Sequence, residues 1–521
     1  MKNKFIAYMF VGGLLMGTSC SDFLDTMPDN RVEVNMAEQI TPLLVSAYPS
    51  QMPLLIGELS SDNVIDNGGQ FDAEKIQQQL YLWQDVTEVD MDSPTGIWES
   101  CYNAIASANQ ALQGIERLGN TSNLQGQKGE ALLCRAYSHF ILSNIFCMAY
   151  NPQTAEQELG IPYCTEPETQ VSVKYDRGTL AETYAMIEKD LEAGLPLITD
   201  SYYSVPKYHF NKRAANAFAA RFYLYYQKWD KALACANAAL GTDPSAVLRQ
   251  WEADFGNISS VSDIENMYIS EKKSANFFIA ALYSTAPYYT GPYDIYKRYG
   301  HGQEVYLNEG LGANGLWNAW GGLVMSNYII TVHQKNPFPK MTVNFEYIDK
   351  TSGIGYPHAV TVPFTSDETL LTRAEAHVLG EHNYAAALSD INLWIKYHSS
   401  LTAQGRDLTL DDIQSAYSRM SYAPIVINKA SDRSIKKKLN PQGFVVNAGV
   451  EESLIQLILQ LRRLDTLQEG LRWQDLKRYG IEFSHNRVGD TPDVLLKDDP
   501  RRAIQLPQDV VNAGLTPNPR Y

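Results

Sequence analysis

Aromatic side chains are concentrated in one irregular stretch of this sequence. Between Tyr283 and Trp320, seven Tyr and two Trp occur within 38 residues, about three times their average density in the whole chain. The same stretch contains six glycines. Flat rings held on loops suit the apolar C–H faces of sugar rings, and phenol and indole groups donate hydrogen bonds to hydroxyls. The pattern therefore favours a ligand platform here, although any single ring can equally support the loop or the core.

Two tryptophans three residues apart are the leading candidates for this platform. One helical turn would point the rings of Trp317 and Trp320 to the same side, and flanking glycines would let a ligand approach closely. The tyrosines expected to assist are Tyr288, Tyr289, Tyr293 and Tyr296. Asp62 and Asn63, in an early polar loop, are weaker candidates that would supply directional hydrogen bonds. The alternative interpretation places both tryptophans in the folded core.

Motifs for nucleotide binding, metal binding and catalysis lack the context that their chemistry needs. The stretch 310–315 reads GxGxxG, but a Trp-rich segment follows it in place of a helix, and Lys335 stands where an acid is required. The histidines show no HExxH pattern, and no GxSxG nucleophile occurs. We therefore assign no catalytic residue, no cofactor and no metal ligand.

Two alternatives stay open at this stage. The oxygen-rich stretch 62–72 resembles a calcium loop, but Val64 occupies its second ligand position. Pairs of Asp and Glu residues could serve a glycoside hydrolase, and sequence cannot show whether two carboxylates lie at catalytic separation.

Helical periodicity dominates the elements that must position these residues. Apolar residues recur at three- and four-residue spacing in eight segments, which are 98–118, 129–149, 180–195, 212–226, 229–240, 368–379, 384–397 and 451–466. With Arg213 at position 1, five positions of a 34-residue tetratricopeptide unit are matched, namely Ala220, Tyr223, Ala232, Ala239 and Pro244. The fold class predicted is mostly α, with tetratricopeptide-like helix pairs that form a curved scaffold.

Two irregular stretches interrupt the helices. Residues 241–366 are expected to form a loop-rich insertion with a small β-hairpin, in which the alternating segment 341–347 pairs with 356–364. Residues 421–447 carry Lys436, Lys437 and Lys438 and are expected to form a solvated loop.

The N-terminus has the features of a lipoprotein signal peptide. Two lysines precede an apolar stretch at 5–19, and small residues stand directly before Cys20. Residues 1–19 are therefore predicted to be removed, with Cys20 lipidated. The apolar stretch is shorter than the roughly 20 residues of a transmembrane helix, and no later stretch is longer. The net charge of −16 argues against a nucleic-acid partner, because such proteins use Lys and Arg to neutralise phosphates.

The C-terminal third carries a family resemblance. The segment LRRLDTLQEGLRWQDLKR at 461–478 resembles the ERRxELxFEGxRWxDLxR segment of SusD/RagB-type (starch-utilisation-system D-like) outer-membrane lipoproteins. Leu461 and Asp465 stand where Glu is usual in that segment. These two departures affect only the expectation of an ion-pair network in a structural helix. Further segments resemble the family at 130–137, 211–215, 373–376, 504–507 and 518–519.

This resemblance implies one SusD-like domain over residues 20–521, anchored by lipid at the cell surface of the outer membrane. It implies a protein that is not an enzyme, captures glycans and delivers them to a SusC-like TonB-dependent transporter. No site residue is carried over, because the family's glycan sites lie on variable loops. The alternatives are a peptide-capturing RagB-like protein and, less in keeping with the sequence, a glycoside hydrolase on a helical scaffold.

Overall fold

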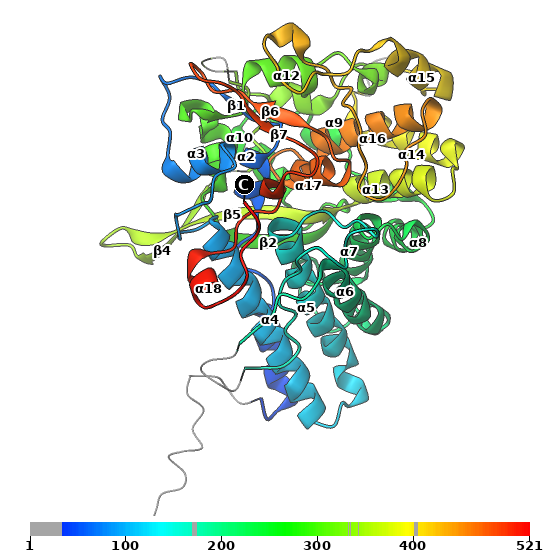
Figure 1. The fold of residues 1–521 in the computed structure, drawn as a ribbon. Coiled ribbons are helices and arrows are strands. Elements are labelled where there is room, and N and C mark those ends of the chain that lie inside the picture. The colour runs from blue at the N-terminus through cyan, green and yellow to red at the C-terminus, as the bar shows by residue number, and fades with distance from the viewer. Residues whose placement is uncertain are drawn as a thin grey trace, which may run out of the picture.

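Antiparallel helix pairs make up the lower part of the structure (Figure 1). The computed structural model describes residues 34–168, 174–331, 333, 335–341, 343–400 and 405–520, so Cys20 and the predicted signal peptide lie outside the described residues. The long helices of this part are α4 (Pro94–Arg117), α5 (Gln125–Phe146), α6 (Leu180–Gly194), α7 (Lys212–Tyr225) and α8 (Trp229–Leu240). Along the chain, α4 packs on α5, α5 on α6, and α7 on α8.

A second group of helices continues this scaffold at the upper right of Figure 1. It consists of α13 (Ser366–Leu379), α14 (Tyr384–His398), α15 (Leu410–Arg419), α16 (Val450–Asp465) and α17 (Leu471–Arg478). Helix α13 packs on α8, α14 and α16, and so joins the two groups. The mostly helical fold class is confirmed, as is each of the eight predicted helices.

Small side chains explain the close contact of the tetratricopeptide-like pair α7–α8. Ala220 is 1% exposed, and Ala232 and Ala239 are fully buried. Asn211 caps α7 by accepting hydrogen bonds from the backbone N–H groups of Arg213 and Ala214.

Helix α4 starts four residues earlier than predicted because Ser93 caps it and Pro94 suits its first position.

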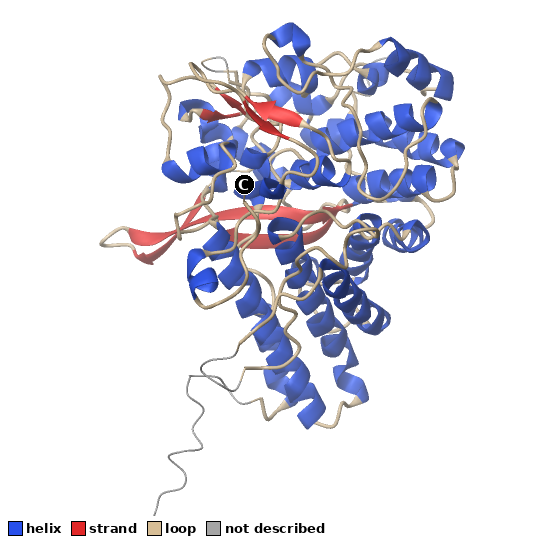
Figure 2. Cartoon of the chain, in the orientation of Figure 1, coloured by secondary structure: helices blue, strands red, loops and turns tan. Residues whose placement is uncertain are grey.

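A three-stranded antiparallel sheet crosses the middle of the molecule, with helices on both sides of it (Figure 2). Its order is β2-β5-β4, with β2 at Asn276–Tyr283, β4 at Asn344–Asp349 and β5 at Ile354–Thr365. The predicted hairpin corresponds to β4 and β5, which form a projecting arm. Strand β2 was missed, because its apolar residues run continuously instead of alternating.

An aromatic cluster joins this sheet to the helices. The rings of Phe210 and Phe278 stack with centroids 5.4 Å apart, and Phe364 on β5 lies 5.9 Å from Phe218 and 5.5 Å from Tyr137. All five side chains are at most 4% exposed. Stacked and edge-on aromatic pairs of this kind add to the stability of a core beyond the area that they bury.

Short elements complete the fold. They are α1 (Ile40–Val45), α2 (Leu54–Ser60), β1 (Ile65–Asp66), α3 (Lys75–Tyr81), α9 (Trp251–Phe255), α10 (Val261–Tyr268), α11 (Ala286–Thr290), β3 (Tyr299–Gly300), α12 (Gln303–Glu309), β6 (Phe483–His485), β7 (Asp493–Leu495) and α18 (Gln508–Asn512). Strand β1 pairs with β3, and β6 with β7. Within the described ranges, no helix has the length and apolar character needed to cross a membrane.

Candidate functional site

Three exposed tyrosines gather on α11 and on the 3₁₀ turn that follows it, Pro292–Tyr296. Tyr288 is 37% exposed, Tyr293 46% and Tyr296 61%. The rings of Tyr288 and Tyr293 have centroids 5.9 Å apart. Because a 3₁₀ turn has three residues, Tyr293 and Tyr296 project from the same side of it. We call these three side chains the tyrosine surface.

The loop before α3 holds the tyrosine surface in place. The backbone N–H of Asp72 donates to the carbonyl of Tyr296 at 3.0 Å, and that of Arg298 donates to the carbonyl of Asp72 at 2.7 Å. Glu74 accepts hydrogen bonds from the Tyr289 hydroxyl and the Lys297 ammonium. Although partial burial opposes it, these bonds hold the pKa of Glu74 below its usual value.

A buried ion pair fixes the turn from beneath. Asp294 stands between Tyr293 and Tyr296 in the sequence, and its side chain is fully buried. It accepts hydrogen bonds from the Lys335 ammonium at 2.8 Å and from the backbone N–H of His301 at 2.8 Å. Gly300 is required beside it, because a Cβ there would lie 1.9 Å from the Asp294 Oδ1 atom. The backbone under the exposed rings is thus held from two sides, so little ordering would be needed to bind a ligand.

The two leading tryptophan candidates lie elsewhere. The Leu316–Trp320 turn packs on α14, and Trp317 is its buried residue. Trp317 is fully buried, so our prediction that its ring is a stacking face is corrected: it is a core residue. Gly315 makes room for this indole, since a Cβ would lie 2.3 Å from it. Trp320 is half-buried, with the Lys396 ammonium 5.4 Å from its ring centre.

Tyr289 differs from the three tyrosines around it. It is only 7% exposed, and its hydroxyl is engaged by Glu74. Burial and the Glu74 carboxylate raise its pKa above the ordinary value for tyrosine. Tyr289 therefore supports the surface from within and offers no ring face to a ligand.

Asp62 and Asn63 are engaged by arginines from the C-terminal segment. Asp62 accepts two hydrogen bonds from Arg472, at 2.7 and 2.9 Å, and Asn63 accepts one from Arg463 at 2.8 Å. Although burial opposes it, Arg463 and Arg472 hold the pKa of Asp62 far below its usual range. The two side chains are 9% and 2% exposed. We correct their assignment as ligand donors, because their polar atoms already stabilise the fold.

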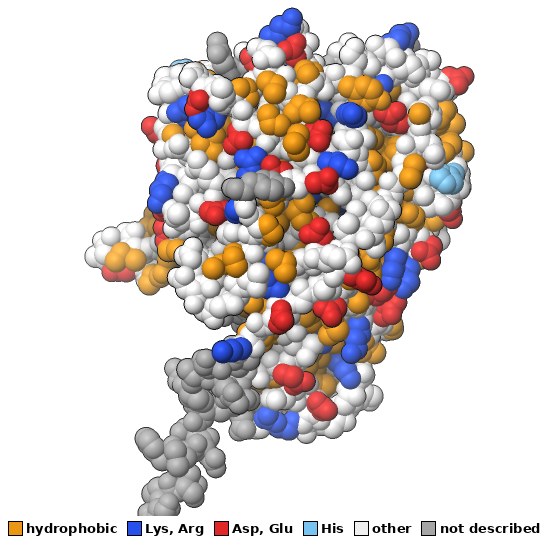
Figure 3. Space-filling model, in the orientation of Figure 1, with side chains coloured by type: hydrophobic (Ala, Val, Ile, Leu, Met, Phe, Trp, Pro, Cys, Tyr) orange, Lys and Arg blue, Asp and Glu red, His pale blue; other side chains and the backbone are white. Residues whose placement is uncertain are grey.

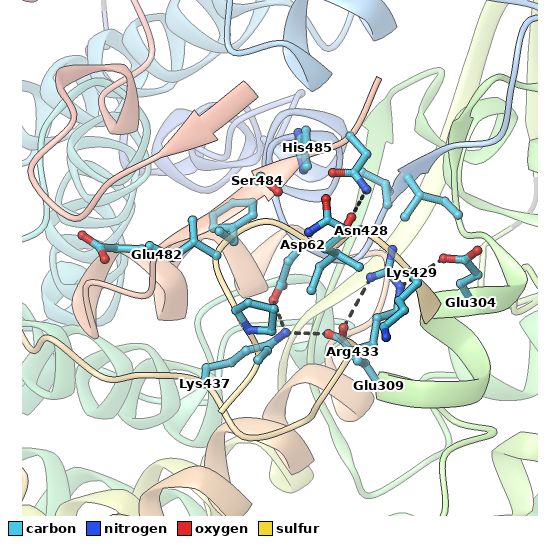
Figure 4. A pocket seen from close by; sticks show the side chains of 18 of the residues that line it. Asp62, Glu304, Glu309, Asn428, Lys429, Arg433, Lys437, Glu482, Ser484 and His485 are labelled. Carbon is cyan, nitrogen blue, oxygen red and sulfur yellow. Dashed lines mark hydrogen bonds and ion pairs between the residues drawn. The ribbon is translucent and has the colours of Figure 1, made fainter. Parts of the chain in front are cut away.

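A pocket of about 450 Å³ lies next to Asp62 (Figure 4). Its walls come from β1, α12, β6 and the segment 422–438. Glu309, at the end of α12, accepts hydrogen bonds from Lys437 at 2.9 Å and Arg463 at 2.8 Å. Despite burial, these cations lower the pKa of Glu309 to about 2. The expectation of a solvated loop is wrong for Lys437, which is only 8% exposed because it pairs with Glu309.

Exposed aromatic residues on the β4–β5 arm escaped the sequence reasoning. Phe345 is 40% exposed, Tyr347 51% and Tyr356 45%. Tyr356 packs edge-on against Tyr283 with centroids 5.7 Å apart. The arm carries hydrophobic side chains into solvent (Figure 3). Strand alternation alone did not mark these rings, because all six residues of β4 are exposed on both faces.

A buried group of titratable residues lies away from both surfaces. The potential ligand atoms of Asp367, His398 and Asp465 lie within 4.8 Å of one another. Burial lowers the pKa of His398 to about 4 and raises that of Asp465 to about 6. The Arg249 guanidinium lies 3.6 Å from Asp367 and already supplies positive charge there. This group is closed to solvent and belongs to the interior charge network of the fold.

Comparison with known proteins shows which family and which folds this chain resembles. Residues 22–224 match the model of a family described as "SusD-like_3: Starch-binding associating with outer membrane". No curated protein sequence matches the chain. A putative sugar binding protein from Bacteroides vulgatus has a similar fold, with TM-score 0.65 and 17% identity, over 94% of this chain and 100% of that one.

Two further structures share the fold. A SusD superfamily protein from Bacteroides thetaiotaomicron has TM-score 0.61 and 17% identity, covering 93% of this chain and 99% of that chain. A SusD-like carbohydrate binding protein from Bacteroides vulgatus has TM-score 0.58 and 15% identity, covering 91% and 96%. At these identities the structures establish the fold alone.

The fold defines a helical-repeat protein with loop-borne surfaces beside its scaffold. Residues 22–224 are thus similar to a SusD-like family, and over more than nine-tenths of its length the chain shares the fold of these structures.

Proposed function

We propose that this protein binds glycans on the tyrosine surface and does not cleave them. The observation that carries the proposal is that three exposed rings stand on a backbone anchored by Glu74, Asp72 and Asp294. The family description names starch, and two of the similar structures are named as sugar or carbohydrate binding proteins. These names support a carbohydrate ligand for this chain.

The rings would supply most of the binding free energy. A stacked tyrosine contributes on the order of 1–2 kcal/mol through apolar burial and contact. Two or three such rings offset the cost of ordering a flexible oligosaccharide and leave an affinity of roughly micromolar to millimolar.

Binding to starch-derived oligosaccharides and to a panel of other glycans tests this proposal. We expect Tyr293→Ala and Tyr296→Ala each to weaken binding about tenfold, roughly 1.4 kcal/mol, with no change in melting temperature because both side chains are exposed. Tyr208→Ala is the matched control, since Tyr208 is 50% exposed on the separate turn before α7. Normal binding by both variants, or no glycan bound by the wild type, would contradict the proposal.

We further propose that the protein is held at the cell surface by lipid on Cys20 and passes its ligand to a TonB-dependent transporter. The family's description as associating with the outer membrane supports this location. The helical scaffold offers enough surface for a stable interface, which buries on the order of 1,200–2,000 Å² or more. The two proteins should co-purify from detergent extracts. Recovery of this protein alone, with its transporter present in the same extract, would contradict the partnership.

A further inference from the structure

One face of the projecting β4–β5 arm (Figure 1) brings aromatic rings and polar groups together. Residues opposite one another on antiparallel strands share a face, and so do residues two positions apart on one strand. His358 on β5 lies opposite Tyr283 on β2 and Asn344 on β4, and Tyr356 lies opposite Glu346. These five side chains therefore share one face of the sheet, which we call the arm face.

The rings of the arm face are held in place by one another. Tyr356 is 45% exposed and packs edge-on against Tyr283, with ring centroids 5.7 Å apart. The ring of Tyr283 in turn lies 4.3 Å, centroid to centroid, from that of His358. Because these contacts already fix the rings, a ligand that stacks on Tyr356 has little to order.

Polar groups beside these rings are open to a ligand. The Glu346 side chain is 57% exposed, and its Oε2 atom accepts a hydrogen bond from the His358 ring at 2.7 Å. Its Oε1 atom and the exposed Asn344 amide form no hydrogen bond with any residue that the structure describes. An aromatic ring next to a free carboxylate oxygen and an amide suits a sugar ring, which offers C–H groups to the first and hydroxyls to the others.

The arm face and the tyrosine surface share one base. Met341 lies three residues before β4, and a Cβ on Gly291, at the start of the tyrosine-bearing turn, would lie only 2.7 Å from its carbonyl oxygen. Tyr283 precedes Tyr288 by five residues, so their Cα atoms lie at most about 18 Å apart. The two surfaces are thus close enough for one polysaccharide chain of several sugar units to contact both.

We propose that the arm face is a second glycan-binding site, and that it and the tyrosine surface bind one long polysaccharide chain together. The inference rests on the proposed glycan-binding function and names the ligand class, a polymer in place of a short oligosaccharide. A sugar ring stacks on Tyr356, and its hydroxyls bond to Glu346 and Asn344. This second contact forms within an already bound complex, so it raises the affinity for a long chain even if it is weak by itself.

A protein partner suits the arm face less well. An added protein strand would pair with the free backbone edge of β4 and leave the arm face uncovered. The buried core of a protein interface is also depleted in charged residues, whereas the exposed Glu346 carboxylate stands opposite Tyr356. A glycan matches this arrangement, because its hydroxyls donate hydrogen bonds to a carboxylate.

The length of the glycan chain tests the proposal. Titration calorimetry of the detergent-solubilised full chain compares chains of three and of about twenty sugar units, prepared from starch and from the other glycans of the panel. We expect the longer chain to bind at least about tenfold more tightly, because only it reaches both surfaces. A longer chain also offers more equivalent positions, and the variants below separate that effect. Equal affinity for the two lengths would overturn the proposal.

Replacing Tyr356 locates the second contact. Tyr356→Ala should weaken binding of the long chain about tenfold, through loss of the stacked ring. Binding of the three-unit chain should stay unchanged, because the tyrosine surface offers it three exposed rings. Tyr347→Ala is the matched control, since Tyr347 is 51% exposed on the same arm but points to the opposite face. Long-chain affinity equal in wild type and Tyr356→Ala, or weakened equally by both variants, would overturn the proposal.

Glu346 gives a second readout that does not remove a ring. Glu346→Gln keeps the shape of the side chain and removes its charge, so it should weaken long-chain binding a few-fold by weakening the hydrogen bonds to sugar hydroxyls. The melting temperature should not change, because the side chain is exposed. Unchanged long-chain binding by this variant would remove Glu346 from the site and contradict the contacts proposed for it.

The two proposals can fail separately. If Tyr293→Ala and Tyr296→Ala weaken binding of both chain lengths while Tyr356→Ala changes neither, only the arm face is wrong. If Tyr356→Ala weakens long-chain binding while the other two variants bind normally, the arm face stands and the tyrosine surface is wrong. If Tyr356→Ala lowers only the recovery of a transporter from detergent extracts, the arm is a protein contact and the inference is overturned.

Discussion

Exposure separates the aromatic residues that can meet a ligand from those that support the fold. Trp317 is fully buried against the scaffold, whereas Tyr296 is 61% exposed only 21 positions earlier in the chain. Both rings lie in the same glycine-rich stretch. A ring in this stretch belongs to the tyrosine surface only if it lies on the side of its short turn that faces solvent and not the helices.

Replacing Trp317 tests its place in the core. We expect Trp317→Ala to lower the free energy of unfolding by about 3–5 kcal/mol, the usual cost of removing a large buried ring. Urea denaturation followed by circular dichroism measures this change. Tyr296→Ala is the control and should unfold at the wild-type urea concentration. Wild-type stability of Trp317→Ala, together with lost glycan binding, would return this ring to the binding site.

Asp465, which departs from the Glu usual in the resembled segment, makes stability depend on pH. Burial raises its pKa from 3.8 to about 6, so between these values the folded state keeps a proton that the unfolded state releases. The stabilisation that this bound proton gives to the folded state is complete below pH 3.8 and is lost as the pH rises to about 6. The stability advantage of wild type over Asp465→Asn should therefore fall by up to about 3 kcal/mol from pH 4 to pH 7. Urea unfolding of both proteins at each pH checks this; a constant difference would contradict it.

Helices α2 and α17 approach each other more closely than any side chain would allow. A Cβ on Gly57 would lie 2.3 Å from the carbonyl oxygen of Gly470, which itself has a φ of +73° at the start of α17. This contact holds Arg472, on α17, next to Asp62. The resembled C-terminal segment thus serves to lock an early helix to a late one.

Filling this contact should force the two helices apart. We expect Gly57→Ala to lower the free energy of unfolding by about 1–3 kcal/mol through overpacking. Gly69→Ala is the control, since its Cβ would meet nothing within 4 Å and its φ is not positive. Thermal unfolding of both variants measures the difference. Equal melting temperatures would show that the helices can separate at little cost.

At the scale of the whole molecule, the chain is predicted to be anchored to the membrane through lipid on Cys20. One acyl chain binds membranes weakly, so stable attachment requires the multiply acylated cysteine of bacterial lipoproteins. Cys20→Ala should move the protein from the membrane fraction to the soluble fraction or leave it unprocessed, as fractionation and mass determination show. Ser21→Ala is a suitable control, because it leaves the acceptor thiol intact. Unchanged membrane fractionation of Cys20→Ala would contradict the anchor.

Local sequence determined the helical scaffold of this protein. Eight long helices, α4 to α8, α13, α14 and α16, were predictable because each buries a stripe of apolar residues at helical spacing, and the α7–α8 pair because its alanines permit close contact. The resemblance in the segment 461–478 indicated the fold that the similar structures share. These features depend on residues close together in the chain, which is why sequence alone reveals them.

The tertiary structure alone decided which surfaces are available to a ligand. Trp317 is buried where its turn packs on α14, and Asp62 is buried where it accepts hydrogen bonds from Arg472, 410 positions away. The burial of these two side chains could not be predicted from the residues next to them in the sequence. The polar pocket joins residues near 62, 309, 433 and 485, and no spacing rule connects them. Burial and charge pairing depend on contacts between distant segments, because free energy is gained only where the folded chain brings their side chains together.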